Sequence, residues 1–170
     1  MAATIFKHTG DFNAHTKSNR ALRFVHKYFA EVTSSLKLNY PDTEYYAPSA
    51  VFFDTKNVTY TGAKDIKKWM LELFSPFDKL SLTGISFFVV DESTSGRSLY
   101  TVNAETMVSY YVKGDPVPIS VPRLFVFEIK DDEDGQGWDG LQFFDIKLYW
   151  DTALLVDEIK RRKAATWRNL

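Results

Sequence analysis

An aspartate and a tyrosine of this sequence are side chains of types that could take part in proton-transfer chemistry. Asp54 directly follows the apolar run 51–53, and apolar surroundings raise a carboxyl pKa enough for the group to accept and return a proton. Tyr28 lies on the apolar stripe of an expected helix, where a phenol could donate a hydrogen bond to a developing enolate oxygen. The alternatives are structural: Asp54 as a turn residue bonded to nearby backbone amides, and Tyr28 as a core residue.

Arg123 and Asp145 are charged side chains within expected strands, and each has two interpretations. If Arg123 faces a cavity, its guanidinium would bind an anionic or enolic ligand by paired hydrogen bonds; if it faces solvent, it has no such role. Asp145 shares one face of the last strand with Lys147 and Tyr149, either as an outer charged pair with Lys147 or as a polar group in a cavity. The other face, at positions 144, 146, 148 and 150, is apolar and should pack under helices or against another subunit.

The sequence offers few side chains for metal binding or nucleophilic catalysis. Its three histidines, His8, His15 and His26, all lie near the N-terminus, so no strand histidine can act as a base or a metal ligand. There is no cysteine, which excludes disulfides, thiolate metal sites and cysteine nucleophiles. No cofactor or metal site is therefore expected.

Helices followed by long strands must position these side chains. Apolar residues spaced by three and four predict a helix that begins near Thr16, capped by Thr16 or Ser18 and stopped by Pro41. A short helix at 41–47, a hairpin of strands 50–54 and 57–60, and a helix from about 62 to 75 follow. Four long strands are then expected, at 81–91, 98–113, 119–130 and 141–150, before a last helix at 152–163. Short connections favour antiparallel neighbours, so the sequence predicts an α+β fold.

Composition places this chain among ordinary single-domain globular proteins with many aromatic residues. Its 170 residues suit one domain, with residues 1–15 as an N-terminal arm and 16–170 as the domain. The 14 Phe, 9 Tyr and 4 Trp indicate a bulky core or an apolar cavity. The net charge of −1 shows no basic excess, and no run has the length of a signal or membrane segment. We expect a soluble, cytoplasmic protein without nucleic-acid or membrane partners.

Several segments together resemble the nuclear-transport-factor-two-like superfamily, which includes SnoaL-like polyketide cyclases, ketosteroid isomerases and scytalone dehydratases. The resemblance covers about residues 17 to 151 and is carried by loose hydrophobic frames, which specify the fold better than the activity. These frames are FVHKYFAEV at 24–32, EYYAPSAVFFDT at 44–55, YTGAKDIKKWM at 60–70, and LFVFEI through LYWD in the last two strands. The resemblance implies a cone: a strongly curved antiparallel half-barrel sheet on three N-terminal helices, with a ligand pocket inside and a C-terminal helix.

The resemblance also implies site residues. Asp54 occupies the position of the isomerases' catalytic base, and Tyr28 that of their hydrogen-bonding tyrosine. Phe52, Trp69 and Tyr149 would shape the cavity, with Arg123 and Asp145 as further substrate-binding residues. The sequence departs from the isomerases near the start of the third long strand, where it lacks their second acid and has Arg123 instead. It also lacks the pocket histidines of the cyclases and dehydratases.

Two functions follow as hypotheses. The first is a cofactor-independent isomerase, cyclase or dehydratase that acts on a small hydrophobic carbonyl compound of polyketide or terpenoid type. The second is a non-catalytic module of the same fold that binds a hydrophobic ligand or dimerises, because a fold by itself does not assign an activity. A homodimer is what the resemblance implies for the assembly.

Overall fold

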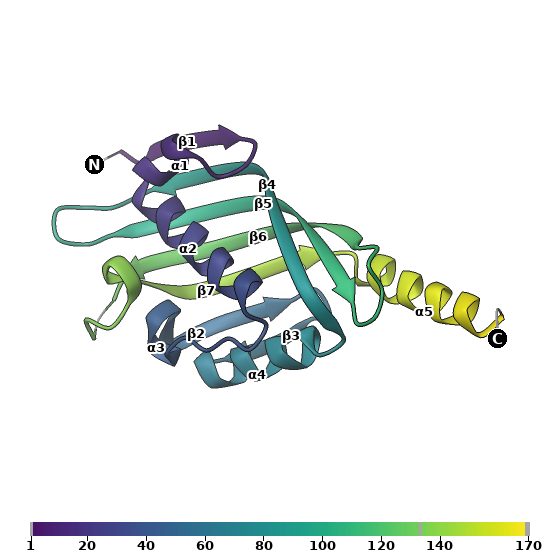
Figure 1. Ribbon diagram of the computed structural model, residues 1–170. Helices are drawn as coiled ribbons and strands as arrows, with labels where there is room; N and C mark the ends of the chain where they lie inside the picture. The colour runs from purple at the N-terminus through teal and green to yellow at the C-terminus, as the bar shows by residue number, and fades with distance from the viewer. Residues whose placement is uncertain (1, 133, 169–170) are drawn as a thin grey trace.

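The computed structural model describes residues 2–132 and 134–168, with side chains to Arg162, and contains a curved sheet with helices on its concave side (Figure 1). Its strands are β1 Thr4–Thr9, β2 Tyr46–Asp54, β3 Val58–Thr61, β4 Phe77–Asp91, β5 Leu99–Val112, β6 Ile119–Asp131 and β7 Leu141–Trp150. Its helices are α1 Ala14–Ser18, α2 Arg20–Ser34, α3 Asp42–Tyr45, α4 Ala63–Phe74 and α5 Thr152–Arg168, with a 3-10 turn at Trp138–Gly140. The predicted α+β fold class is confirmed.

The strands form a single sheet in the order β1-β4-β5-β6-β7-β2-β3. The four long strands, β4 to β7, pair as the predicted antiparallel meander. The sheet as a whole is mixed rather than antiparallel, because β2 pairs in parallel with β7. This pairing sets Asp54, at the end of β2, opposite Leu148 of the last strand.

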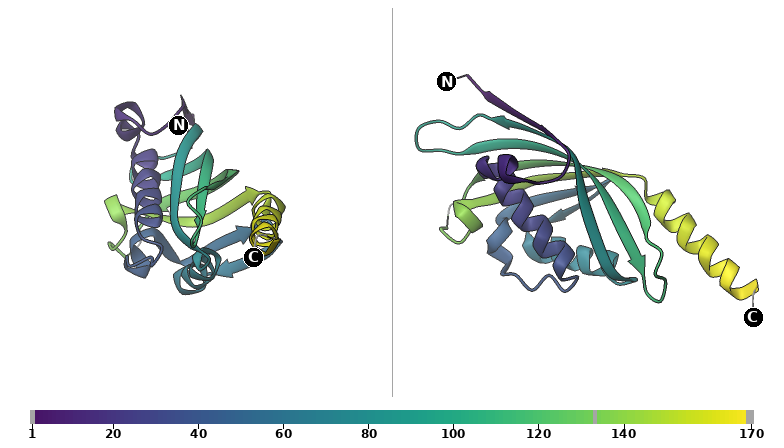
Figure 2. Two further views of the ribbon diagram at one scale, coloured as in Figure 1. Left: turned by 45° about the vertical axis from the view of Figure 1, so that its right-hand side comes forward. Right: turned by 45° about the horizontal axis from the view of Figure 1, so that its top comes forward.

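Register shifts bend the sheet around the helices. Pairing shifts between β4 and β5 at Gly84, and between β6 and β7 at Glu128, and an extra residue in one strand bends it and increases its twist. A side chain at position 84 would clash, since an added Cβ would lie 2.7 Å from the ring of Phe87. The ends of β4 and β5 therefore curve past α2 and α4 and close one side of the cone (Figure 2).

Asparagines, not the predicted Thr16 or Ser18, cap the first helices. The side chain of Asn13 accepts from the backbone at the start of α1, and that of Asn19 accepts from the backbone at the start of α2. The expected continuous helix is consequently broken at Asn19 into α1 and α2. The apolar stripe of α2 still packs against the sheet, as its spacing predicts.

The N-terminal segment differs from the arm predicted for residues 1–15. Thr4–Thr9 form β1, an edge strand that pairs with β4 and sets Ile5 opposite Val90. The strand was missed because its side chains mix polar and apolar types on both faces. Its backbone hydrogen bonds to β4, rather than apolar burial, determine its structure.

The last helix is present as predicted but extends away from the sheet (Figure 1). Leu155 is buried at its base, whereas Leu154 and Val156 are exposed. Arg162 bonds to Asp115 at 2.8 Å and so ties α5 to the β5–β6 connection. No helix within the described ranges is long and apolar enough to cross a bilayer.

Candidate functional site

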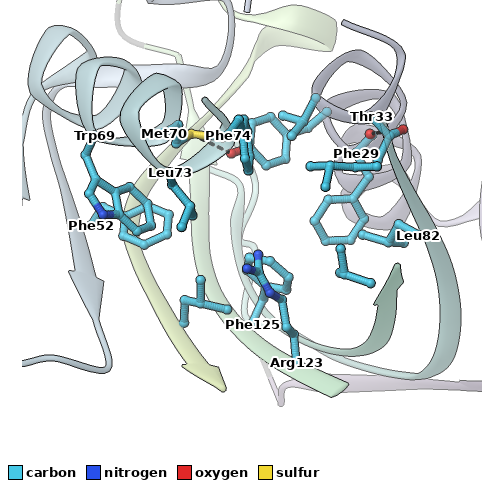
Figure 3. Close-up of a pocket in the computed structure, with 15 residues that line it drawn as sticks. Phe29, Thr33, Phe52, Trp69, Met70, Leu73, Phe74, Leu82, Arg123 and Phe125 are labelled. Carbon is cyan, nitrogen blue, oxygen red and sulfur yellow. Dashed lines mark hydrogen bonds between the residues drawn. The ribbon is translucent and has the colours of Figure 1, made fainter. Parts of the chain in front are cut away.

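The candidate site is a cavity between α2, α4 and the concave face of the sheet (Figure 3). The cavity is small, with about 40 Å³ open to the centre of a water-sized group. Three polar residues line it, Tyr28, Thr33 and Arg123. The remaining lining residues are apolar: Phe29, Val32, Phe52, Trp69, Met70, Leu73, Phe74, Leu80, Leu82, Val108, Phe125 and Leu148.

Arg123 is the one charged side chain among the described residues that line this cavity. It stands on the inner face of β6, on the same side as Val121 and Phe125, and is only 6% exposed. Its Nε and Nη2 atoms are buried and make no hydrogen bond to any described residue. Figure 3 shows its side chain rising from the sheet toward the cavity. Two strong donors thus lie buried and unpaired beside the cavity, and a ligand reaches them only if a covering side chain moves.

Two aromatic rings accompany the guanidinium of Arg123. Its central carbon lies 4.0 Å from the ring centroid of Trp150 and 5.0 Å from that of Tyr110. A desolvated cation beside an aromatic face gains about 2 kcal/mol, which offsets part of the cost of its burial. Burial lowers the pKa of Arg123 to about 9, while the Asp54 carboxylate acts in the opposite direction.

Asp54 is buried at the end of β2 but does not line the cavity. Its side chain is 3% exposed, and Oδ1 accepts from the backbone N–H of Thr55 at 2.8 Å and from the Thr55 hydroxyl at 3.3 Å. The indole N–H of Trp150 donates to the same oxygen at 3.4 Å. The alternative interpretation of Asp54 as a residue bonded to nearby backbone therefore matches these contacts, and its catalytic role stays a prediction.

Tyr28 is held at the cavity wall by a second tyrosine. Its hydroxyl lies 2.7 Å from that of Tyr46, and the hydroxyl whose proton is not used in that bond can donate weakly to the sulfur of Met70. Tyr40 extends the group, with its hydroxyl 3.5 Å from that of Tyr46. Burial raises the pKa of Tyr28 and of Tyr46 well above the usual value, so both hydroxyls stay protonated and can donate.

The predicted ligand contacts of Asp145 and Tyr149 are not found in this cavity. Both lie on the outer face of β7, where Asp145 pairs with Lys147 at 3.3 Å and Tyr149 is 45% exposed. The β-bulge opposite Glu128 is the reason, because it lets Phe143 turn inward while the next odd-numbered residues turn outward. The other predicted contacts, Phe52, Trp69 and Arg123, do line the cavity together with Tyr28.

The histidines lie outside the cavity. His26 lines a surface hollow that shares Phe29, Thr33 and Leu82 with it, and its ring lies 4.6 Å from that of Phe12. Burial, followed by the nearby charge of Lys17, lowers the pKa of His26. No group of three potential metal-binding side chains occurs within the described ranges.

Sequence reasoning missed Trp150, Tyr110 and Tyr46 as members of the site. A usable signal existed for Trp150, since it shares the apolar face of its strand with Ile146 and Leu148. Tyr110 likewise shares the inner face of β5 with Val108. The contact of Trp150 with Asp54 had no local signal, because it depends on the pairing of β2 with β7.

Comparisons with known proteins identify the fold. No protein-family model matches the sequence, and no curated protein matches it. Several solved structures match this chain over most of their own length. LinA is 12% identical with a TM-score of 0.58, and the match covers 81% of this chain and 88% of LinA.

Two further matches carry descriptive names. A Catenulispora acidiphila protein with a ketosteroid-isomerase-like fold, solved with trimethylamine, is 15% identical with a TM-score of 0.52, over 76% of this chain and 86% of its own. A Shewanella denitrificans protein described as a SnoaL-like polyketide cyclase is 12% identical with a TM-score of 0.50, and the match covers 88% of this chain and 99% of that protein. The chain therefore has the nuclear-transport-factor-two-like fold that its sequence resembles, and identities this low show the fold alone.

Proposed function

We propose that this domain binds one small, mainly apolar molecule in the cavity between α2, α4 and the sheet. The observation that carries the proposal is the buried guanidinium of Arg123, whose Nε and Nη2 have no partner among the described residues beside a largely apolar space. Native proteins rarely leave buried donors unpaired, so a site of this kind is typical of a ligand position. Arg123 would bind the oxygen-bearing end of the ligand, and the apolar walls would bind its carbon skeleton.

The cavity sets the size of this ligand. The open volume is small, so a short chain requires less movement of the walls than a long one. A polyketide- or terpenoid-sized molecule would require the side chains of Trp69 and Leu73 to move. Trp69 packs between Phe52 and Tyr60, with ring centroids 4.7 and 4.9 Å away, which opposes such movement. A small ligand is therefore favoured.

A cofactor-independent isomerase, cyclase or dehydratase is the second candidate. It is supported by the protonated hydroxyl of Tyr28 and the guanidinium of Arg123, which together could stabilise a developing enolate oxygen. The fold shared with a SnoaL-like polyketide cyclase is consistent with it. Asp54 as the base would have to move toward the ligand, because it does not line the cavity and its Oδ1 already accepts from Thr55 and Trp150. Binding without turnover needs no such step and is the simpler proposal.

The binding proposal can be tested by filling the cavity from one helix. Leu73 lines the cavity, whereas Leu71 of the same helix is exposed, so Leu73→Trp and Leu71→Trp form a matched pair. Isobutyrate and isobutyramide serve as probes, with binding followed by ligand-observed NMR. We expect binding to wild type and L71W and loss of binding to L73W. Binding that survives in L73W would place the site elsewhere.

The catalytic candidate has its own test. A base that removes a proton next to a carbonyl exchanges that proton for deuterium in heavy water. Turnover would be supported if short ketones exchange deuterium only when the protein is present. Asp54→Asn should abolish this exchange, and the control Asp145→Asn should not. If the wild-type protein binds the ketone but no exchange occurs, the catalytic candidate is rejected and the binding function is retained.

A further inference from the structure

We infer that the ligand of this cavity is a short-chain monocarboxylate, held side-on by Nε and Nη2 of Arg123. The inference rests on the proposed binding function and names its substrate class. It also assigns Trp150 and Asp54 as positioning residues that keep the guanidinium in place.

The two unpartnered atoms of Arg123 form one edge of the guanidinium. The N–H of Nε and one N–H of Nη2 point in the same direction, and their separation matches the two oxygens of a carboxylate. A carboxylate accepts both hydrogen bonds at once, whereas a ketone or amide oxygen satisfies them less well. The geometry of the free edge thus favours a planar anion with two oxygens.

The protein gives Arg123 no direct counter-ion. Arg123 makes no ion pair within 4.0 Å with any described residue, and the carboxylate of Asp54 is bonded to Thr55 and Trp150. A buried, unpaired cation is costly, and an anionic ligand removes that cost when it binds. A neutral ligand of the same shape would leave the charge unpaired, so the site discriminates by charge.

The walls determine the rest of the ligand. Only one cation lines the cavity among the described residues, and Figure 3 shows Met70 and Phe74 on the side opposite Arg123. A single charge balances a monocarboxylate, whereas a phosphate would bring more charge and more acceptors than these walls can match. The limited volume restricts the carbon chain to a few atoms.

Trp150 couples Asp54 to this site. Its ring face lies 4.0 Å from the guanidinium carbon, while its N–H donates to Asp54. A ring that donates to a carboxylate is held at a fixed angle, and this fixes the plane of the guanidinium that stacks on it. Asp54 thus positions the guanidinium through Trp150, without contact between Asp54 and the ligand.

The experiment compares isobutyrate with isobutyramide, a neutral molecule of nearly the same shape, by calorimetry on the full chain. We expect wild type to bind isobutyrate at least about tenfold more tightly, because hydrogen bonds between two charged groups are stronger than those to a neutral amide. Arg123→Met should abolish the preference, and Arg123→Lys should reduce it, since a lysine keeps the charge but not the paired edge. The control Arg97→Met removes an exposed charge and should leave the preference unchanged. Asp54→Asn keeps an oxygen for the indole but removes a negative charge near the guanidinium, so it should raise the affinity for isobutyrate and leave that for isobutyramide unchanged.

The outcomes separate the two proposals. Equal binding of isobutyrate and isobutyramide to wild type, lost in L73W, would overturn the carboxylate inference and retain the cavity as a binding site. A preference lost equally in R97M and R123M would mean a general surface-charge effect and would also overturn it. If wild type binds neither probe, the proposed function and the inference both fail.

Discussion

The guanidinium of Arg123 stacks on the indole of Trp150, with its central carbon 4.0 Å from the ring centroid. The same indole donates to Asp54 at 3.4 Å. Three residues from three strands, β6, β7 and β2, therefore form one connected group beside the cavity. This group holds a positive charge in the interior without a direct ion pair.

Replacement of Arg123 by methionine should stabilise the protein. Methionine has a similar length and needs no hydrogen bonds, whereas the arginine is desolvated and its Nε and Nη2 are unpartnered. We expect the free energy of unfolding to rise by about 2 kcal/mol, measured by urea denaturation without ligand. R97M, which changes an exposed arginine, should lie within about 0.5 kcal/mol of wild type. A clear loss of stability in R123M would show that its aromatic stacking outweighs its desolvation.

Asp54 and Arg123 should show energetic coupling although they form no ion pair. Asp54→Asn keeps an oxygen for Thr55 and Trp150 but removes the charge that favours the buried cation. We expect D54N to destabilise wild type by about 1 kcal/mol and to have a smaller effect in the R123M background. A double-mutant cycle in urea measures the difference. Equal effects in both backgrounds would mean that Asp54 acts only as a local turn residue.

The inward orientation of Arg123 could have been predicted from the sequence. Val121, Arg123, Phe125 and Phe127 have the same parity, and strands alternate with a period of two, so the arginine belongs to the apolar face. The helices and long strands were predictable for the same reason, since each depends on a local pattern.

Contacts between distant segments could not be predicted in this way. The parallel pairing of β2 with β7 leaves no local pattern, and it is this pairing that brings Trp150 to Asp54. The bulge opposite Glu128 also leaves no recognisable pattern in the sequence. It is this bulge that lets Asp145 and Tyr149 face outward although Phe143 faces inward. The parts of the site that were missed are those that depend on long-range pairing.

The buried tyrosines should make stability fall at alkaline pH. Burial raises the pKa of Tyr40 to about 12 in the folded protein, against about 10 in an unfolded chain. Between these values the unfolded chain binds fewer protons at Tyr40 than the folded protein, so the stability present below pH 10 is lost as pH rises. The loss from Tyr40 alone should reach about 2–3 kcal/mol near pH 12.

Tyr40→Phe isolates this contribution, since it keeps the ring on which Lys67 lies at 4.6 Å. Its stability should fall less steeply than that of wild type between pH 10 and 12, as measured by urea denaturation at several pH values. Tyr149→Phe is the control, because that ring is 45% exposed and loses less hydration on folding. Parallel curves for Y40F and wild type would contradict the prediction.

Truncation of Trp69 should enlarge the site at the expense of stability. Trp69→Ala removes the ring that packs between Phe52 and Tyr60 at one wall of the cavity. We expect a loss of about 2–3 kcal/mol, less than for a fully buried tryptophan because Trp69 is half-buried. Calorimetry should also show tighter binding of longer carboxylates such as octanoate. If octanoate binds W69A no better than wild type, Trp69 does not limit the length of the ligand.

The parallel pairing of β2 with β7 also governs when the cavity can exist during synthesis. Asp54 leaves the ribosome early, and its partner Trp150 is among the last residues of the sheet to be made. A nascent chain that ends before β7 has β6 and its arginine but neither the indole face nor the neighbour that β2 requires. A chain that stops before Trp150 would therefore lack one wall of this group, so the binding site depends on the last strand of the sheet.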